Sequence, residues 1–264
     1  MNLKPRKRFL RLIRSVHPRL GLRGSDVILA SFPKSGNTWM RFIWANIVSE
    51  LELGPRVVDF HSLHKEIGCD YDEYRYGRLR FECMPRLVKT HQLFSERTFR
   101  ANRVLYIFRH PCDVMLSYHA FRAAKVRRTR VARMGFAEFI RDQKYGIPGW
   151  ARHFKSWLPR ATAIVGYEAL KERPCREMER VLADLKIENV DAASIESAVA
   201  KSSFQNTRAL EERFGRPHDG KFQQGFRFTR GGASGDWKSQ FSREDLEYVR
   251  SQIDCLGLAE WVTL

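Results

Sequence analysis

The sequence alternates between short apolar runs and longer stretches in which apolar residues recur every three or four positions. Apolar runs at 26–32, 86–90, 103–108 and 161–165 have the composition of buried strands. Helical spacing appears at about 38–50, 111–123, 136–144, 150–157, 174–185 and 242–253. Strands that alternate with helices predict an α/β fold, with a central, mostly parallel β-sheet flanked by helices on both faces. The 264 residues suit a single domain of this class.

Polar residues follow each predicted strand. On an open parallel sheet, ligands bind beyond the carboxyl ends of the strands, so these residues indicate the chemistry. The segment "SFPKSGNTW" at 31–39 follows the first strand, "KTH" at 89–91 ends the second, and Arg109 and Tyr167 follow the third and fourth. A glycine-rich stretch at 230–238 has a basic residue at each end. Several cations at one sheet edge favour a ligand with several separated anionic groups.

The first of these segments resembles a phosphate-binding loop, although Lys34 precedes Gly36, the only glycine of the turn. It joins a buried strand to a predicted helix, whose free N–H groups and positive dipole end attract an oxyanion. Further short polar donors in the loop are Ser35, Asn37 and Thr38. Taken alone, the segment also fits an ordinary strand-to-helix turn with Lys34 in solvent.

The charge of the chain indicates an anionic partner. Lys and Arg together number 47 against 30 Asp and Glu, which gives a formal net charge of +17. Such a field attracts nucleic acid, acidic membranes, anionic cofactors and acidic substrates alike. The sequence contains no zinc-finger pattern, aromatic RNA-binding signature or internal repeat, so we expect no nucleic acid partner.

The cysteines and the apolar runs indicate the cellular location of the protein. The five cysteines are scattered and show no CxxC spacing, which indicates free thiols and no metal site. No apolar run approaches the length needed to cross a bilayer, and the N-terminus lacks the apolar stretch of a secretory signal. We therefore expect a cytoplasmic protein.

Residues 1–24 form a basic, amphipathic segment ahead of the predicted domain at 25–264. Within 4–23, one helical face is apolar, and Lys and Arg occupy many of the remaining positions. The apolar positions are Phe9, Leu12, Ile13, Val16 and Leu20. This pattern fits peripheral contact with an acidic membrane surface, an organellar presequence, or a helix packed over the sheet edge.

The order of the motifs resembles that of cytosolic-type sulfotransferases, which transfer a sulfuryl group from 3′-phosphoadenosine-5′-phosphosulfate (PAPS) to an acceptor. The similarity runs from about residue 26 to residue 250 and implies the P-loop-like sulfotransferase fold. The matching segments are "PKSGNTW" (33–39), "KTH" (89–91), "FRHPCDVMLSY" (108–118), "GYEAL" (166–170), "SSFQNTR" (202–208) and "RGGASGDWK" (230–238). The match is specific because several motifs occur in the family's order.

This resemblance implies a binding site for PAPS and for its product, adenosine 3′,5′-bisphosphate (PAP). The implied phosphosulfate loop comprises Lys34, Ser35, Gly36, Asn37 and Thr38. The implied contacts of the 3′-phosphate are Arg109, Ser117, Arg230, Gly231 and Gly232, and those of the adenine are Trp39, Tyr167, Ser202 and Phe204. Gly231 stands where the family usually has Lys, which removes one charge from the 3′-phosphate site. The family's dimer motif is only half present, so the oligomeric state stays open.

The residue types and the resemblance together assign the chemistry. Sulfuryl transfer is an in-line displacement that removes a proton from the acceptor hydroxyl or amine while negative charge grows on the leaving oxygen. We expect His91 to take the proton as general base and Lys34 to stabilise the leaving oxygen. Lys89, two residues before His91 on the same strand face, is expected to steady the sulfuryl oxygens. The resemblance implies that Ser117 also restrains Lys34 until the acceptor binds. It also implies that the reaction requires no metal.

The acceptor is the least determined part of the prediction. Residues 121–133 contain several Lys and Arg and no acidic residue. This basic run favours an anionic or heavily hydroxylated acceptor, such as an acidic glycan or a lipid head group, and it equally fits a solvated helix face.

A P-loop nucleotide kinase and a polyanion-binding module are the alternative functions. A kinase needs a Lys after the last glycine and an acidic strand-end residue for Mg²⁺, and the sequence offers neither clearly.

Overall fold

The structure is a computed structural model that describes residues 21–54, 56–65, 67–73, 81–126, 129–217, 219–229 and 234–264. Its sheet has five strands in the order β2-β3-β1-β4-β5, and every neighbouring pair is parallel. The strands are β1 (Val27–Ala30), β2 (Cys69–Asp70), β3 (Leu87–Thr90), β4 (Arg103–Phe108) and β5 (Ala163–Gly166). The predicted α/β fold with a parallel sheet is confirmed.

Strand β1 lies at the centre of the sheet because its residues are apolar on both faces. Val27 and Leu29 pack into the core on one side of the sheet, and Ile28 and Ala30 into the core on the other. All four are fully buried. β1 pairs with β3 on one side and with β4 on the other, so the strand order changes direction at β1. Ligands bind beyond the strand ends at such a switch point.

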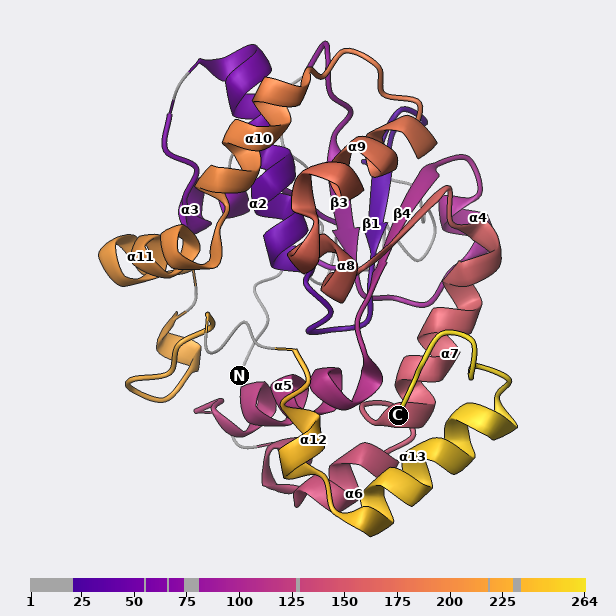
Figure 1. Ribbon diagram of the computed structural model, residues 1–264. Coiled ribbons are helices and arrows are strands. Elements are labelled where there is room, and N and C mark those ends of the chain that lie inside the picture. The colour runs from indigo at the N-terminus through magenta and orange to yellow at the C-terminus, as the bar shows by residue number, and fades with distance from the viewer. Residues whose placement is uncertain are drawn as a thin grey trace.

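Helices cover both faces of the sheet (Figure 1). The helices over the first face are α2 (Asn37–Val48), α3 (Phe60–Lys65), α8 (Tyr167–Glu172), α9 (Pro174–Asp184) and α10 (Ala192–Lys201). Those over the second face are α5 (Pro111–Ala123), α6 (Phe136–Arg141), α7 (Ile147–Trp157), α12 (Trp237–Gln240) and α13 (Arg243–Cys255). The remaining elements are α4 (Glu96–Phe99), α11 (Phe204–Phe214), a π-helical turn (Ser49–Leu53) and the 3₁₀ turns Arg130–Arg133, Leu158–Arg160 and Asp219–Lys221.

Helix α7 supplies the bulkiest part of the second core. Trp150, Phe154 and Trp157 are fully buried, and the rings of Trp150 and Phe154 stack with their centroids 5.4 Å apart. The indole N–H of Trp157 donates to the backbone oxygen of Gln92 at 2.8 Å. α7 therefore also fixes the chain that leaves β3, where the sequence predicts a catalytic residue.

Helices α10 and α11 lie outside the elements that the sequence predicts, as does the two-residue strand β2. α10 buries only Ile195 and Ala198, and α11 buries only Thr207. Helices with so few large buried residues produce a weak periodicity in the sequence. The side chains of Asp191 and Ser203 cap the first turns of the two helices, and these caps are the local signal that marks both starts.

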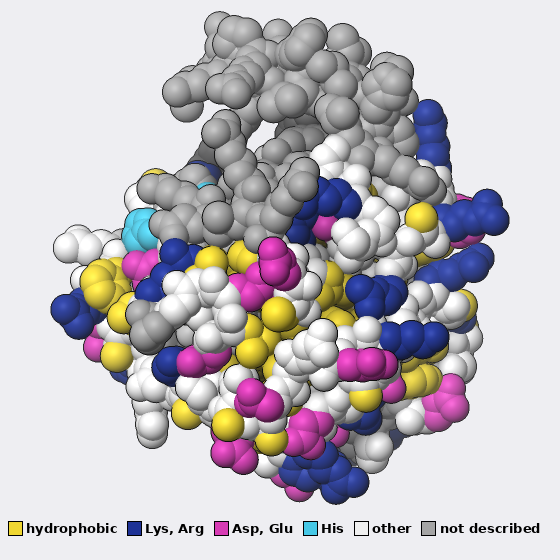
Figure 2. Space-filling view, turned by 90° about the horizontal axis from the view of Figure 1, so that it is seen from above, with side chains coloured by type: hydrophobic (Ala, Val, Ile, Leu, Met, Phe, Trp, Pro, Cys, Tyr) yellow, Lys and Arg dark blue, Asp and Glu magenta, His cyan; other side chains and the backbone are white. Residues whose placement is uncertain are grey.

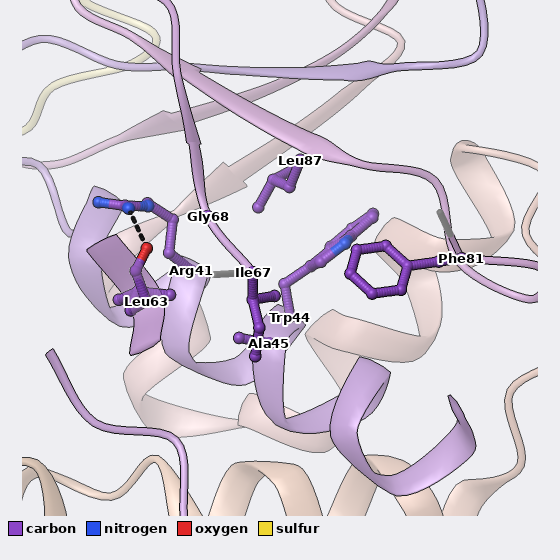
Figure 3. A pocket seen from close by; sticks show the side chains of 8 residues that line it. All are labelled: Arg41, Trp44, Ala45, Leu63, Ile67, Gly68, Phe81 and Leu87. Carbon is purple, nitrogen blue, oxygen red and sulfur yellow. Dashed lines mark hydrogen bonds between the residues drawn. The ribbon is translucent and has the colours of Figure 1, made fainter. Parts of the chain in front are cut away.

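A small pocket lies between α2, α3 and the start of β3 (Figure 3). Its lining residues are Arg41, Trp44, Ala45, Leu63, Ile67, Gly68, Phe81 and Leu87. Arg41 donates to the carbonyl oxygen of Leu63 at 3.0 Å, and a Cβ on Gly68 would lie 2.0 Å from that oxygen. The pocket volume of about 10 Å³ accommodates one water molecule, so it is too small for a substrate.

Basic side chains are dispersed on the face of the molecule seen from above. Among the described residues of that face, Figure 2 shows Asp and Glu side chains lying between Lys and Arg side chains. Surface charges of both signs at such spacing partly cancel at the distance of a bound polymer. The described part of this face therefore gives no support to the polyanion-binding alternative.

Candidate active site

The loop between β1 and α2 brings two residues with left-handed backbone to the carboxyl edge of the sheet. Lys34 has a φ of +75° and Gly36 a φ of +100°, and Gly36 is the N-cap of α2. A Cβ on Gly36 would lie 2.6 Å from Cδ2 of Tyr167, so only glycine fits this turn. The first N–H groups of α2 follow directly, in the arrangement that binds oxyanions in proteins.

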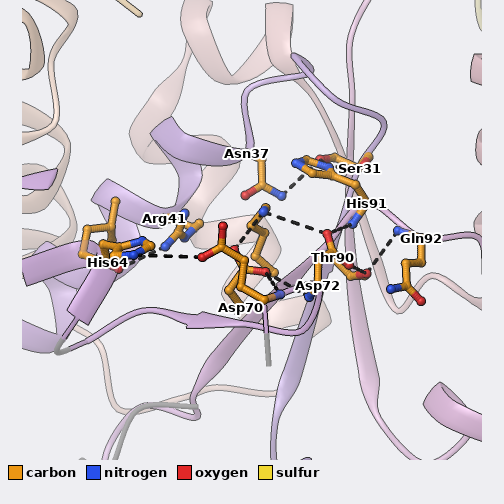
Figure 4. A network of polar contacts seen from close by, with 12 residues as sticks. Ser31, Asn37, Arg41, His64, Asp70, Asp72, Thr90, His91 and Gln92 are labelled. Carbon is orange, nitrogen blue, oxygen red and sulfur yellow. Dashed lines mark hydrogen bonds and ion pairs between the residues drawn. The ribbon is translucent and has the colours of Figure 1, made fainter. Parts of the chain in front are cut away.

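His91 follows β3 and contacts this loop (Figure 4). Its Nδ1 lies 2.8 Å from the carbonyl oxygen of Ser31. A carbonyl oxygen can only accept a hydrogen bond, so Nδ1 carries the proton and Nε2 of the neutral ring is unprotonated. Burial, reinforced by the charge of Lys89, lowers the pKa of His91 to about 3. The imidazole is therefore neutral at physiological pH, and its Nε2 can accept a proton.

Two carboxylates hold the end of β3, and sequence reasoning missed both (Figure 4). Asp72 accepts hydrogen bonds from the His91 backbone N–H and from the Thr90 hydroxyl, each at 2.9 Å. Asp70 accepts one from the Lys89 ammonium at 2.9 Å, and that ammonium lies 3.9 Å from Asp72. Burial raises the pKa of Asp72, and the Lys89 charge opposes this effect. His91 is thus fixed through its backbone as well as its ring.

The short strand β2 explains why no local pattern reveals these carboxylates. β2 contains only Cys69 and Asp70, and Asp70 is in register with Lys89 of β3. Two residues cannot show a strand periodicity. The available signal was the acidic cluster "DYDE" at 70–73, and its partner could be found only from the sheet register.

The ammonium of Lys34 lies among aromatic rings. Its Nζ is 3.8 Å from the ring centroid of Phe228 and 4.7 Å from that of Phe121. Both distances are within the range of a cation–π contact. Ser117, which the resemblance assigns to restrain this lysine, lies one turn before Phe121 on α5, so the two residues share a face of that helix.

Arg109, Tyr167 and Trp39 form a second group of charge and rings next to Gly36. The guanidinium carbon of Arg109 lies 4.5 Å from the ring centroid of Tyr167. Trp39 meets the same ring edge to face, with the centroids 5.7 Å apart. Burial raises the pKa of Tyr167, so its hydroxyl stays neutral and can donate. The structure thus brings together three residues to which the resemblance assigns nucleotide contacts.

The start of α5 is tied to the second half of the glycine-rich stretch. Asp113 accepts a hydrogen bond from the Gly235 N–H at 2.8 Å. The ring of His110 stacks on that of Trp237 at 4.8 Å, and its Nε2 lies 3.0 Å from the backbone oxygen of Thr263. The residues Arg230, Gly231 and Gly232, expected at the 3′-phosphate, lie outside the described part of the chain.

The remaining residues expected at the adenine differ in exposure. Ser202 is fully buried, and its Oγ accepts a hydrogen bond from Asn46 of α2 at 2.9 Å. Phe204, the first residue of α11, is 38% exposed. Ser202 is therefore tied to the helix that begins at the oxyanion loop, and Phe204 presents part of its ring to the surface.

Three buried polar atoms at the start of α2 have no hydrogen-bond partner among the residues that the structure describes. They are Ser35 Oγ, Asn37 Oδ1 and Trp39 Nε1. Asn37 uses its Nδ2 to donate to Ser31 Oγ at 3.1 Å. Unpaired buried polar atoms are rare in proteins, and here they gather on one loop and the first turn of its helix. They are groups that a ligand with phosphate and sugar oxygens can satisfy.

The described residues include no group of three or more His, Cys, Asp or Glu side chains that could hold a metal ion. Within the same part of the chain, no helix is both long enough and apolar enough to span a bilayer. The basic segment at 4–20, and Arg127 and Arg128 of the basic run, lie outside the described residues.

These features define a class of protein, a parallel α/β fold with an oxyanion loop after its central strand and a histidine held against that loop. The model of the family described as the sulfotransferase domain matches residues 24–261. The chain belongs to the sulfotransferase family, and the resemblance of its motifs is confirmed.

Individual relatives match most of the chain. Sulfotransferase 1A1 of Rattus norvegicus is 27% identical over 249 residues, which cover 87% of this chain and 85% of the relative. Flavonol 3-sulfotransferase of Flaveria bidentis is 25% identical over 257 residues, which cover 87% of this chain and 81% of the relative. Retinol dehydratase in complex with androsterone and the inactive cofactor PAP aligns with a TM-score of 0.68 at 18% identity, covering 92% of this chain and 83% of that one. A mouse sulfotransferase complexed with PAP aligns with a TM-score of 0.66 at 19% identity, and the alignment covers 93% of this chain and 87% of that one.

Proposed function

We propose that this protein transfers the sulfuryl group of PAPS to a hydroxyl group of an acceptor, or to an amine, by in-line displacement. One observation carries the proposal, the hydrogen bond at 2.8 Å between His91 Nδ1 and the backbone oxygen of Ser31. It holds a neutral imidazole against the loop that fits an oxyanion. Membership of the sulfotransferase family supports the reaction class.

The residues around the loop fit PAPS as the sulfuryl donor. The phosphosulfate would be held by Lys34, Ser35, Gly36, Asn37 and Thr38, the 3′-phosphate by Arg109, Ser117, Arg230, Gly231 and Gly232, and the adenine by Trp39, Tyr167, Ser202 and Phe204. The unpaired buried atoms of Ser35, Asn37 and Trp39 support this assignment. So do the two aligned structures, both of which contain PAP.

In the proposed step, Nε2 of His91 takes the proton of the acceptor hydroxyl as the acceptor oxygen forms its bond to sulfur. The bond between sulfur and the bridging phosphate oxygen breaks, and its electron pair stays on PAP. Lys34 stabilises the negative charge on that oxygen, because an ammonium at the loop acts where charge develops. Lys89 lies on the same strand face as His91 and steadies the sulfuryl oxygens.

We propose a hydroxylated acceptor that carries negative charge, such as an acidic glycan or a lipid head group. Arg130, whose side chain is 82% exposed, and Lys125, which lies 5.2 Å from the ring of Phe121, place charge near the end of α5. Retinol dehydratase, by contrast, has been solved with androsterone and with retinol. A cytoplasmic location and peripheral membrane contact through 4–23 stay predictions, and the oligomeric state stays open.

Calorimetry with PAP, 5′-AMP, ATP and a DNA duplex tests the site and separates it from the kinase and polyanion-binding alternatives. We expect PAP to bind at least about tenfold more tightly than 5′-AMP, because one charge-assisted contact contributes roughly 1.5–3 kcal/mol. Arg109→Ala should remove most of this difference, whereas Arg243→Ala, at a side chain that is 94% exposed on α13, should not. Equal affinities of the wild type for PAP and 5′-AMP would contradict the assignment.

A panel of neutral and anionic hydroxyl acceptors, assayed with labelled PAPS at two ionic strengths, tests the acceptor. If the acceptor is anionic, its kcat/KM should fall as salt screens the field over the Debye length of about 8–10 Å. Joint replacement of Arg127, Arg128 and Arg130 by Ser should have the same effect. A best acceptor that is neutral and responds to neither change would show that the basic run is only solvated surface.

A further inference from the structure

We propose that Phe121 and Phe228 are positioning residues that hold the ammonium of Lys34 in the nucleotide-free protein and release it when an oxyanion enters the loop. The inference rests on the proposed function, since it concerns the lysine assigned to the leaving oxygen. The aromatic contact itself is a property of the fold and can be measured without any reaction.

The two rings come from distant parts of the chain. Phe121 lies in the last turn of α5, and Phe228 lies between α11 and α12. Their centroids are 6.4 Å apart and their planes cross at 83°. The Nζ of Lys34 lies 3.8 Å from the Phe228 centroid and 4.7 Å from the Phe121 centroid. A cation this close to the face of a ring is attracted by the ring quadrupole, so the ammonium has two such partners.

Helix α11 fixes the position of Phe228. Glu211 accepts hydrogen bonds from the backbone N–H groups of Phe228 at 2.7 Å and Thr229 at 2.9 Å, and also from the Thr229 hydroxyl. The guanidinium of Arg216 lies 4.6 Å from the Phe228 centroid and pairs with Glu211 and Asp219. The side chains of Arg216 and Glu211 are only 8% and 10% exposed, so this ring has a defined place before any ligand binds.

The two rings carry no formal charge, so their contact with the ammonium adds nothing that would repel an incoming phosphosulfate. A ring holds the ammonium without adding formal negative charge, and a multiply charged anion can outcompete its weaker attraction. The backbone of Lys34 is fixed in the left-handed region at φ +75°, so only the end of its side chain has to move.

A double-mutant cycle on the ligand-free protein tests the contact independently of catalysis. Lys34→Met removes the charge and Phe228→Leu removes the ring, while both keep apolar bulk. In urea unfolding, the effect of the double mutant on the unfolding equilibrium constant should differ by a factor of about two to five from the product of the two single-mutant effects. A cycle with Phe228→Tyr in place of Phe228→Leu should show that Tyr retains the interaction with Lys34. Phe222→Leu is the matched control, because Phe222 stacks on Phe226 in the same aromatic region. Absence of coupling at Phe228, or equal coupling at Phe222, overturns the proposal.

Calorimetry with PAP tests the release of the lysine. Because the rings compete with the anion for the ammonium, Phe228→Leu should bind PAP about two- to fivefold more tightly than the wild type. The gain should vanish in the Lys34→Met background. A loss of affinity that is equal in both backgrounds means that the ring contacts the nucleotide itself, and overturns the proposal. If the wild type binds no PAP, the proposed function fails, and the unfolding cycle still decides the aromatic contact.

Discussion

Lys34 and Lys89 both reach the carboxyl edge of the sheet, but their ammonium groups have different surroundings. Lys89 is bonded to Asp70 at 2.9 Å and lies 3.9 Å from Asp72. Lys34 lies against the rings of Phe228 and Phe121. The charge of Lys89 is therefore compensated by two carboxylates, whereas the rings leave the charge of Lys34 formally intact.

The difference suggests separate tasks for the two lysines under the proposed function. The ion pairs of Lys89 fix the positions of Asp70 and Asp72. Asp72 in turn accepts a hydrogen bond from the backbone N–H of His91. The ammonium of Lys34, close to a helix N-terminus, adds to the local positive field and attracts an anion. On this comparison, removal of Lys34 should mainly affect turnover and nucleotide binding, and removal of Lys89 should lower stability in addition to its effect on turnover.

The largest effect is expected at His91, which the Lys89 network positions. Replacement of His91 by Ala should lower turnover by about 10²–10⁴-fold, since a general base contributes that much, and should leave the PAP dissociation constant nearly unchanged. Single-turnover assays with labelled PAPS, together with calorimetry, measure the two quantities. His64→Ala is the control, because His64 lies on α3 and faces Glu73 at 4.0 Å. Near-normal turnover of His91→Ala would mean that another group is the base.

The next effect is expected at Lys34, whose ammonium lies against the rings of Phe228 and Phe121. Lys34→Ala should lower turnover by about 10²–10³-fold, the usual loss when one group that stabilises developing charge is removed. It should also weaken PAP binding, which His91→Ala should not. Lys34→Arg should restore binding more than turnover, because a guanidinium carries the charge but has a different shape. If Lys34→Ala left both quantities unchanged, the contrast between the two lysines would be lost.

A smaller effect, on stability, is expected at Lys89. The side chains of Lys89 and Asp70 are 17% and 5% exposed, so Lys89→Met removes a largely buried cation from the carboxylates of Asp70 and Asp72. We expect a loss of about 3 kcal/mol in the free energy of unfolding, measured in urea. Asp70→Asn combined with Lys89→Met should recover part of that loss, because it removes one of the two neighbouring negative charges. Unchanged stability in Lys89→Met would show that this ion pair does not hold the end of β3.

The smallest effect is the pH dependence of stability from His91, which is half-buried, and from His153, which is buried. Burial lowers the pKa of both His91 and His153 to about 3. The unfolded chain binds these protons near pH 6.5, so their contribution is complete above pH 6.5 and is lost as the pH falls toward 3. Each histidine adds a slope of up to about 1.4 kcal/mol per pH unit. Urea unfolding at pH 7, 6 and 5 should show a shallower dependence for His153→Gln, and an identical dependence would contradict the assignment.

The sequence by itself determined the fold class and most of the candidate site. Buried strands such as 103–108 appear as apolar runs, because a strand covered on both faces needs apolar side chains throughout. The positions after those strands identified Lys34, His91 and Arg109, because parallel strands deliver their carboxyl ends to one edge. Both signals are local along the chain, and a pattern of residues can report them.

Only the tertiary structure decided how these residues are held. Asp70 meets Lys89 through a two-residue strand that has no periodicity of its own, and Phe228 contacts Lys34 although the two residues are far apart in the sequence. Helices α10 and α11 were missed for a related reason, since they bury few large side chains. Periodicity records whether a side chain is buried, but the group that it contacts depends on which segments the sheet order brings together. For this reason the catalytic candidates could be read from the sequence, whereas the partners that position them could not.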